Sequence, residues 1–132
     1  MIDKTLLEKC RQLVGNKRDE IITLAQRLVR LPSLSGNEGA VAELVREAMQ
    51  QLNYDEVRLD AAGNVIGLVK GGDGPSTIFN GHMDVVDSGR QEDWPYPPFG
   101  AEIQQGFMWG RGSADMKCAL AAMIFAACIM PL

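Results

Sequence analysis

The segment over about residues 115–130 places the strongest constraint on how this 132-residue chain can fold. Its apolar residues recur at helical spacing, and Lys117 is its only cation. These apolar positions are Met116, Ala119, Leu120, Met123, Ile124 and Ala127. A helix that is apolar nearly all round is a buried one, so other layers must pack around it. Residues 118–132 are fewer than the roughly 20 that span a bilayer, which favours a core helix over a membrane span.

Three earlier segments also carry apolar residues at helical spacing. The expected helices cover residues 6–14, 21–29 and about 37–52. Asn16 can cap the second helix, and Pro32 ends it, because the residue before a proline is restricted to extended backbone. Ser35 and Glu38 fit the Ser-x-x-Glu capping box at the start of the third helix.

After the third helix the apolar pattern changes to that of strands. The expected strands cover residues 57–59, 65–69 and 77–79, and a hairpin covers residues 101–112. Gln105 and Gly106 lie near the turn of the hairpin. The run Thr77-Ile78-Phe79 is apolar enough for a central strand. Helices mixed with strands in this order predict an α/β fold with layers around a central sheet.

Charge and cysteine content narrow the class of protein. The net charge is −4 without a cluster of Lys or Arg, which argues against nucleic acid or an anionic membrane as the main partner. The first twelve residues carry charges on both sides of a short apolar stretch, unlike a signal peptide. The three cysteines are odd in number and lack a metal-binding spacing, which favours reduced thiols in a cytoplasmic protein.

His82 is the only histidine of the chain, and it follows the apolar run at residues 77–79 almost directly. A lone histidine is usually structural. However, ligands of α/β sheets bind at the carboxyl ends of strands, where His82 would lie. Asp84 points to the same side as His82 in extended backbone, so it can accept a hydrogen bond from one ring nitrogen. That contact would fix the histidine tautomer and leave the other nitrogen for a metal.

The motif GRGSADMK, residues 110–117, delivers Asp115 to the start of the last helix. Asp115 can be a helix cap or a metal-binding carboxylate, and spacing alone does not separate the two. Arg111 and Lys117 are expected to hold the loop rather than contact a substrate. The aromatic residues expected to pack beside the site are Trp94, Phe99 and Trp109.

Three motifs in this order, GHMDVVD, DWPYPPF and GFMWGRGSADMK, resemble the zinc-dependent aminoacylase/carboxypeptidase family. That family includes acetylornithine deacetylases, succinyl-diaminopimelate desuccinylases and glutamate carboxypeptidases. The upstream stretch LVRLPSLSGNEGAVAELV resembles the first conserved block of the same family. Cys118 departs from the pattern, because the family usually has glycine after Met-Lys.

The resemblance implies a metal-dependent hydrolase of amide or peptide bonds, acting on N-acyl amino acids or peptides through a metal-activated water. It implies a three-layer sandwich with a central mixed sheet flanked by helices. By resemblance, His82 binds one metal, Asp115 bridges two, and Asp84 is a catalytic residue that supports His82. The two ions would be zinc, with cobalt or manganese as alternatives. The resemblance also implies a non-prolyl cis peptide between Asp115 and Met116, and a homodimer for the complete protein.

The same resemblance places the family's Glu-Glu pair, a later acidic ligand and a second histidine beyond residue 132. Residues 1–132 are therefore expected to be the amino-terminal part of the catalytic domain, inactive alone, without the rest of that domain and the dimerisation or lid domain. The local carboxylates are better explained as surface or cap residues than as a general base; they are Glu38, Glu92, Asp93 and Glu102. The alternative is a non-catalytic binding or interaction module with an incomplete metal site.

Overall fold

Helices supply most of the regular secondary structure in the computed structural model, which describes residues 3–129. The helices are α1 (Lys4–Asn16), α2 (Arg18–Arg30), α3 (Gly39–Gln51) and α4 (Cys118–Ile129). The strands are β1 (Glu56–Leu59), β2 (Val65–Leu68), β3 (Glu102–Gln104) and β4 (Phe107–Trp109). A short 3-10 turn covers Gln91–Asp93, and an irregular helical turn over Ser113–Lys117 leads into α4. None of the described helices is long and apolar enough to cross a membrane.

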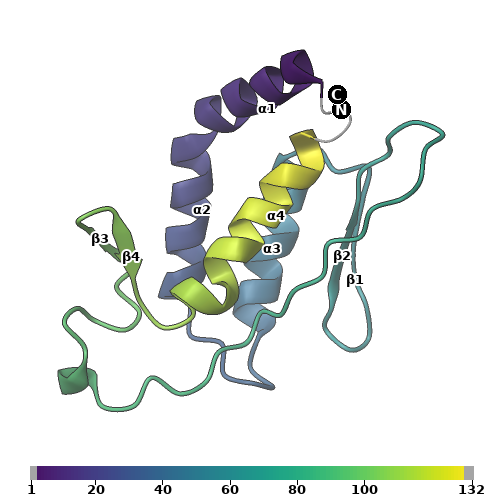
Figure 1. Ribbon diagram of the computed structural model, residues 1–132. Coiled ribbons are helices and arrows are strands. Elements are labelled where there is room, and N and C mark those ends of the chain that lie inside the picture. The colour runs from purple at the N-terminus through teal and green to yellow at the C-terminus, as the bar shows by residue number, and fades with distance from the viewer. Residues whose placement is uncertain (1–2, 130–132) are drawn as a thin grey trace.

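The hydrophobic core lies where α2, α3 and α4 meet (Figure 1). Leu28 of α2, Val41 of α3 and Ala121 of α4 are completely buried in it. The expected last helix is thus present, but Ala119 and Ala122 are exposed. The expectation that this helix is buried on nearly every face was therefore wrong for its described residues, because α2 and α3 cover only part of the α4 surface.

The two expected strand pairs form as predicted. Strands β1 and β2 pair antiparallel with Val57 opposite Gly67, and they pack against α3. Strands β3 and β4 form the expected hairpin, in which Gln105 and Gly106 have φ angles of 54° and 83°. Two adjacent residues with positive φ make the tight turn that suits the twist of a hairpin.

The expected strand at residues 77–79 is not formed. This segment pairs with neither sheet, and Ile78 is 87% exposed. An apolar run becomes a strand only where a partner satisfies its backbone groups. Further along, Val85 forms a single parallel bridge with Leu34. The described residues therefore combine helices with two separate two-stranded antiparallel sheets, and a central mixed sheet is not among them.

Two expected helix caps are also absent. Helix α1 continues to Asn16, and Lys17 stands at the N-cap of α2 without a side-chain hydrogen bond. Glu38 precedes α3, again without a side-chain cap, and its Oε1 atom instead accepts a hydrogen bond from the Gly36 amide. The Ser35 hydroxyl is directed at Asp84, which links the α2–α3 loop to the candidate site.

Candidate metal centre

Two distant parts of the chain meet at His82. The extended segment that carries His82 is tied to the α2–α3 loop, because the Val85 amide donates to the Ser33 carbonyl at 2.7 Å. The loop before α4 closes on it from the other side. Gly112 has a φ of 81°, and a Cβ atom there would lie 2.4 Å from Val85 Cγ1. Only glycine allows this approach, which brings Asp115 to the His82 ring.

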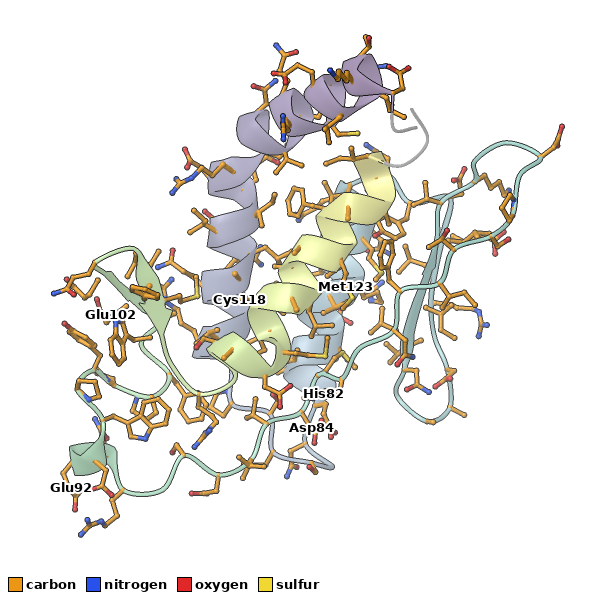
Figure 2. The ribbon with its side chains drawn as sticks, viewed as in Figure 1. His82, Asp84, Glu92, Glu102, Cys118 and Met123 are labelled. Carbon is orange, nitrogen blue, oxygen red and sulfur yellow. The ribbon has the colours of Figure 1, made fainter. Side chains whose placement is uncertain are left out.

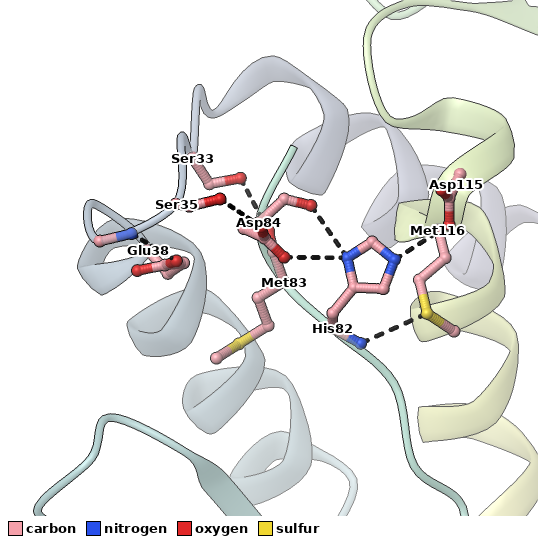
Figure 3. Close-up of polar contacts among 9 residues, drawn as sticks. Ser33, Ser35, Glu38, His82, Met83, Asp84, Asp115 and Met116 are labelled. Carbon is pink, nitrogen blue, oxygen red and sulfur yellow. Dashed lines mark hydrogen bonds and ion pairs between the residues drawn. The ribbon is translucent and has the colours of Figure 1, made fainter. Parts of the chain in front are cut away.

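The His82 ring lies between two carboxylates (Figure 3). Its Nδ1 atom is 3.0 Å from Asp84 Oδ1, and its Nε2 atom is 2.9 Å from Asp115 Oδ1. The sequence-based expectation that His82 and Asp84 lie on the same side, within hydrogen-bonding reach, is confirmed. Their expected position at the end of a central strand was wrong, because the preceding segment is not a strand.

A neutral imidazole has one N–H group, so it can donate a hydrogen bond to only one of the two carboxylates. Both contacts are hydrogen bonds only when the ring is protonated. The Asp115 hydrogen bond accordingly raises the pKa of His82, and contacts with Asp84 add to the effect. A cation at Nε2 would replace the proton and satisfy both the ring and Asp115. Asp84 would then hold the remaining N–H at Nδ1.

Asp84 is itself oriented by Ser35. The Ser35 hydroxyl donates to Asp84 Oδ2 at 2.6 Å, and this bond is the main cause that holds the pKa of Asp84 below its usual value. The carboxylate therefore stays an acceptor toward His82. Spacing along the sequence gave no signal for this contact, because Ser35 lies in a different motif and also fits a helix cap.

Lys117 anchors the turn that carries Asp115. The lysine is completely buried, and its Nζ atom donates to the carbonyl of Leu31 at the end of α2. Burial lowers the pKa of Lys117 to about 8. The expectation that Lys117 holds the loop is confirmed. The peptide bond between Asp115 and Met116 is cis, as the family resemblance implies.

A pocket of about 320 Å³ opens beside this histidine. His82, Asp84 and Asp115 line one part of it, and Trp94 and Arg111 line another. The volume is at the lower end of the range for small-molecule sites. Trp94 was expected to be a packing residue, and its ring is also part of the pocket wall.

The other carboxylates considered as a base do not reach the ring. Glu92 and Glu102 lie well away from His82 (Figure 2). Asp93 pairs with Arg90 at 2.8 Å. Glu38 is held by the Gly36 amide. Their interpretation as surface or cap residues agrees with these contacts.

The side chains present fit part of a metal site. Zinc bonds to histidine nitrogen and carboxylate oxygen are each about 2.0–2.2 Å long, so one ion can contact both atoms when they are about 2.9 Å apart. His82 Nε2 and Asp115 Oδ1 have this separation. Within residues 3–129, no three histidine, cysteine, aspartate or glutamate side chains gather in a metal-binding arrangement. The spacing of His82 Nε2 and Asp115 Oδ1 thus fits two ligands of one ion of the zinc type.

Comparison with known proteins identifies the class. The sequence model of peptidase family M20/M25/M40 matches residues 78–131, the stretch that carries His82, Asp84 and Asp115. This part of the chain is therefore similar to that family. A curated relative is the succinyl-diaminopimelate desuccinylase of Maricaulis maris (strain MCS10). It is 41% identical over 105 residues, which cover 78% of this chain and 27% of the relative. The chain thus spans about a quarter of the length of this relative.

Proposed function

We propose that this chain supplies part of the active site of a metal-dependent hydrolase that cleaves an amide bond. The observation that carries the proposal is the His82 ring, 2.9 Å from Asp115 and 3.0 Å from Asp84 at the wall of a pocket. The similarity of residues 78–131 to peptidase family M20/M25/M40 supports the reaction class.

In this proposal, His82 Nε2 and Asp115 Oδ1 hold a divalent ion. When bound, such an ion polarises the scissile carbonyl and lowers the pKa of a water molecule that attacks it. Asp84 accepts the Nδ1–H hydrogen bond of His82 and so keeps Nε2 free for the ion. Ser35 keeps Asp84 in position, and Lys117 anchors the turn that carries Asp115.

A second ion and the identity of the metal belong to the same proposal. The Asp115 side chain is 86% exposed, and only its Oδ1 atom has a partner in the described part of the chain. The other oxygen can therefore bind a second ion, as a bridging carboxylate does. Zinc is the first choice for nitrogen and carboxylate ligands, with cobalt or manganese as alternatives.

The substrate class follows from the relative's name. Succinyl-diaminopimelate desuccinylase removes a succinyl group from an amino acid, so we propose an N-acyl amino acid or peptide as substrate. The residues would form the amino-terminal part of a catalytic domain with a three-layer sandwich and a central mixed sheet. The single parallel bridge between Val85 and Leu34 supports this, because it is the kind of pairing that a parallel strand would extend. A cytoplasmic location is proposed from the three free cysteines, and a homodimer on the same family grounds.

Zinc titration of the 132-residue chain tests the metal centre. The ring signals of His82 in a ¹⁵N-labelled sample should shift on addition of zinc and return on chelation. The variants His82→Gln and Asp115→Asn should lose this binding. Asp73→Asn is a matched control, because Asp73 lies in an exposed loop. Unchanged zinc binding in both His82→Gln and Asp115→Asn would contradict the proposal.

A chimera tests the reaction. The 105 matched residues would replace their counterparts in the Maricaulis maris desuccinylase. We expect zinc-dependent release of succinate from an N-succinyl amino acid, lost on chelation and in the His82→Ala chimera. The Asp73→Asn chimera should remain active. Metal-dependent turnover that survives His82→Ala would show that His82 is not a ligand.

A further inference from the structure

Arg111 is a positive charge of the pocket that has no acidic partner within residues 3–129. Its backbone amide donates to the Pro98 carbonyl, but its guanidinium forms no ion pair with any residue in the range 3–129. Its Nε atom is buried and lacks a hydrogen-bond acceptor. Only the backbone of Arg111 therefore holds the loop, and the side chain is left for another role.

Trp94 fixes the orientation of this guanidinium. The Arg111 Cζ atom lies 5.1 Å from the centroid of the Trp94 ring, and the Trp94 indole N–H is held by the Ser88 carbonyl at 2.8 Å. Stacking of this kind stabilises the cation over the ring face. The side-chain N–H donors of Arg111 have no hydrogen-bond acceptor within residues 3–129.

A carboxylate is the ligand that such a group recognises best. The planar fork of donors matches the two oxygens of a carboxylate, and the charge of arginine persists at every physiological pH. Buried donors without an acceptor are rare in folded proteins, so an acceptor from outside the described residues is expected at Arg111. Lys117, the other cation of the same motif, is already bound to the Leu31 carbonyl.

We propose that Arg111 binds a carboxylate group of the substrate, while the scissile amide faces His82 and Asp115. This inference rests on the proposed function and adds to it a residue that recognises the free carboxylate of the proposed substrate. Arg111, His82 and Asp115 line the same pocket of about 320 Å³, which is large enough for one small substrate.

The acidic residues of the pocket set an order of binding. Asp84 and Asp115 repel a carboxylate in the absence of a metal, and a divalent ion on His82 and Asp115 offsets their charge. The carboxylate should therefore bind more tightly to the zinc-loaded chain. By linkage, zinc should bind more tightly in the presence of the carboxylate by the same factor.

The test compares two probes that differ in one group, N-acetylglycine and N-acetylglycinamide. The ¹⁵N-labelled 132-residue chain is titrated with each, with and without zinc, and the Arg111 Nε–Hε signal is followed by NMR. N-acetylglycine should shift this signal to saturation and bind about tenfold or more tighter than the amide, as charge-assisted hydrogen bonds allow. Arg111→Met should abolish the preference, and Arg111→Lys should keep part of it. Arg27→Met, which removes an arginine outside the pocket, should keep all of it.

Equal affinity for the two probes, or an Arg111 signal that does not respond to the carboxylate, would overturn the proposal. If Arg111→Met fails to fold, the wild-type titrations and Arg111→Lys still decide. The His82 signals separate the two levels of inference. A zinc shift at His82 without a carboxylate response at Arg111 removes the role of Arg111 and leaves the metal centre. Absence of a zinc shift removes the metal centre, and the titration without zinc then decides on Arg111.

Discussion

Ser35 controls the candidate site through a single hydrogen bond. Its hydroxyl holds Asp84, and Asp84 holds the His82 ring (Figure 3). Replacing Ser35 by alanine should free the carboxylate to rotate and so weaken zinc binding. Removing outer partners of metal ligands typically costs 10–100-fold in metal affinity, and we expect about tenfold for Ser35→Ala, because Asp84 itself remains. Calorimetric zinc titration at pH 7.5 measures this.

The conservative variant separates orientation from folding. Ser35→Thr keeps the hydroxyl and should bind zinc like the original chain. Asp84→Ala should lose more affinity than Ser35→Ala, and the double variant should be no worse than Asp84→Ala alone. Additive losses in the double variant would mean that Ser35 acts independently of Asp84.

The raised pKa of His82 predicts how zinc affinity depends on pH. A proton and a zinc ion compete for Nε2, and the hydrogen bond from the ring to Asp115 raises the pKa of His82 above its usual value of about 6.5. Zinc affinity should therefore fall by up to about tenfold per pH unit as the pH drops below this raised pKa. Zinc titrations between about pH 5.5 and 8 measure the slope. A constant affinity across this range would show that His82 is not a ligand.

At the scale of elements, Lys117 connects the start of α4 to the end of α2. Burial lowers its pKa to about 8, whereas an unfolded lysine has a pKa of about 10.4. Between these values the unfolded chain binds more protons, so the contribution of Lys117 makes the free energy of unfolding rise with pH. Lys117→Met should remove this rise. Urea unfolding of both proteins at about pH 7.5, 8.5 and 9.5 measures the difference between them.

Other groups also titrate in this pH range, so the test compares how the free energy of unfolding of each variant depends on pH. Burial raises the pKa values of Cys118 and Cys128, and these thiols give both proteins the opposite slope. Lys70→Met is the matched control, because Lys70 is exposed and pairs only distantly with Glu56 at 4.0 Å. The free energy of unfolding of Lys70→Met should change with pH as it does in the original chain. If Lys117→Met also shows the pH dependence of the original chain, the lysine is not desolvated in the folded protein.

The elements that the sequence predicts correctly are those that depend on local signals. Helical spacing located α2, α3 and α4, and Gln105-Gly106 located the turn of the β3–β4 hairpin. Residues 77–79 failed, because an apolar run does not reveal whether a partner strand lies beside it. The Ser35-Glu38 capping box failed because a tertiary partner, Asp84, competes for the serine hydroxyl.

The site could be predicted in part for the same reason. His82 and Asp84 are two residues apart, so the alternation of extended backbone was enough to pair them. The approach of Asp115 to His82 depends on Gly112 fitting against Val85, a contact between segments that are distant in sequence. Asp115 was therefore identified from the motif resemblance and not from spacing. The stacking of Arg111 on Trp94 had no local signal, since the two residues lie in separate motifs.

At the scale of the whole molecule, the described residues form a helical core with the proposed metal site at one edge. In that proposal His82 and Asp115 contribute two ligands, whereas catalytic zinc sites commonly have three protein ligands. The described part of the chain brings no further acidic residue to the ring that is free to act as a base. Binding of a metal and turnover of a substrate are therefore separable properties of this sequence.

We accordingly expect the 132-residue chain alone to bind zinc without hydrolysing amides. Purified chain with zinc would be incubated with N-acetyl and N-succinyl amino acids, and the released amine would be measured. The desuccinylase chimera is the positive control, because it adds the remaining parts of a complete enzyme. The chain with His82→Ala, prepared in the same way, reports contaminating hydrolases. Turnover by the unmodified chain that disappears both on chelation and in His82→Ala would show that two protein ligands suffice for catalysis here.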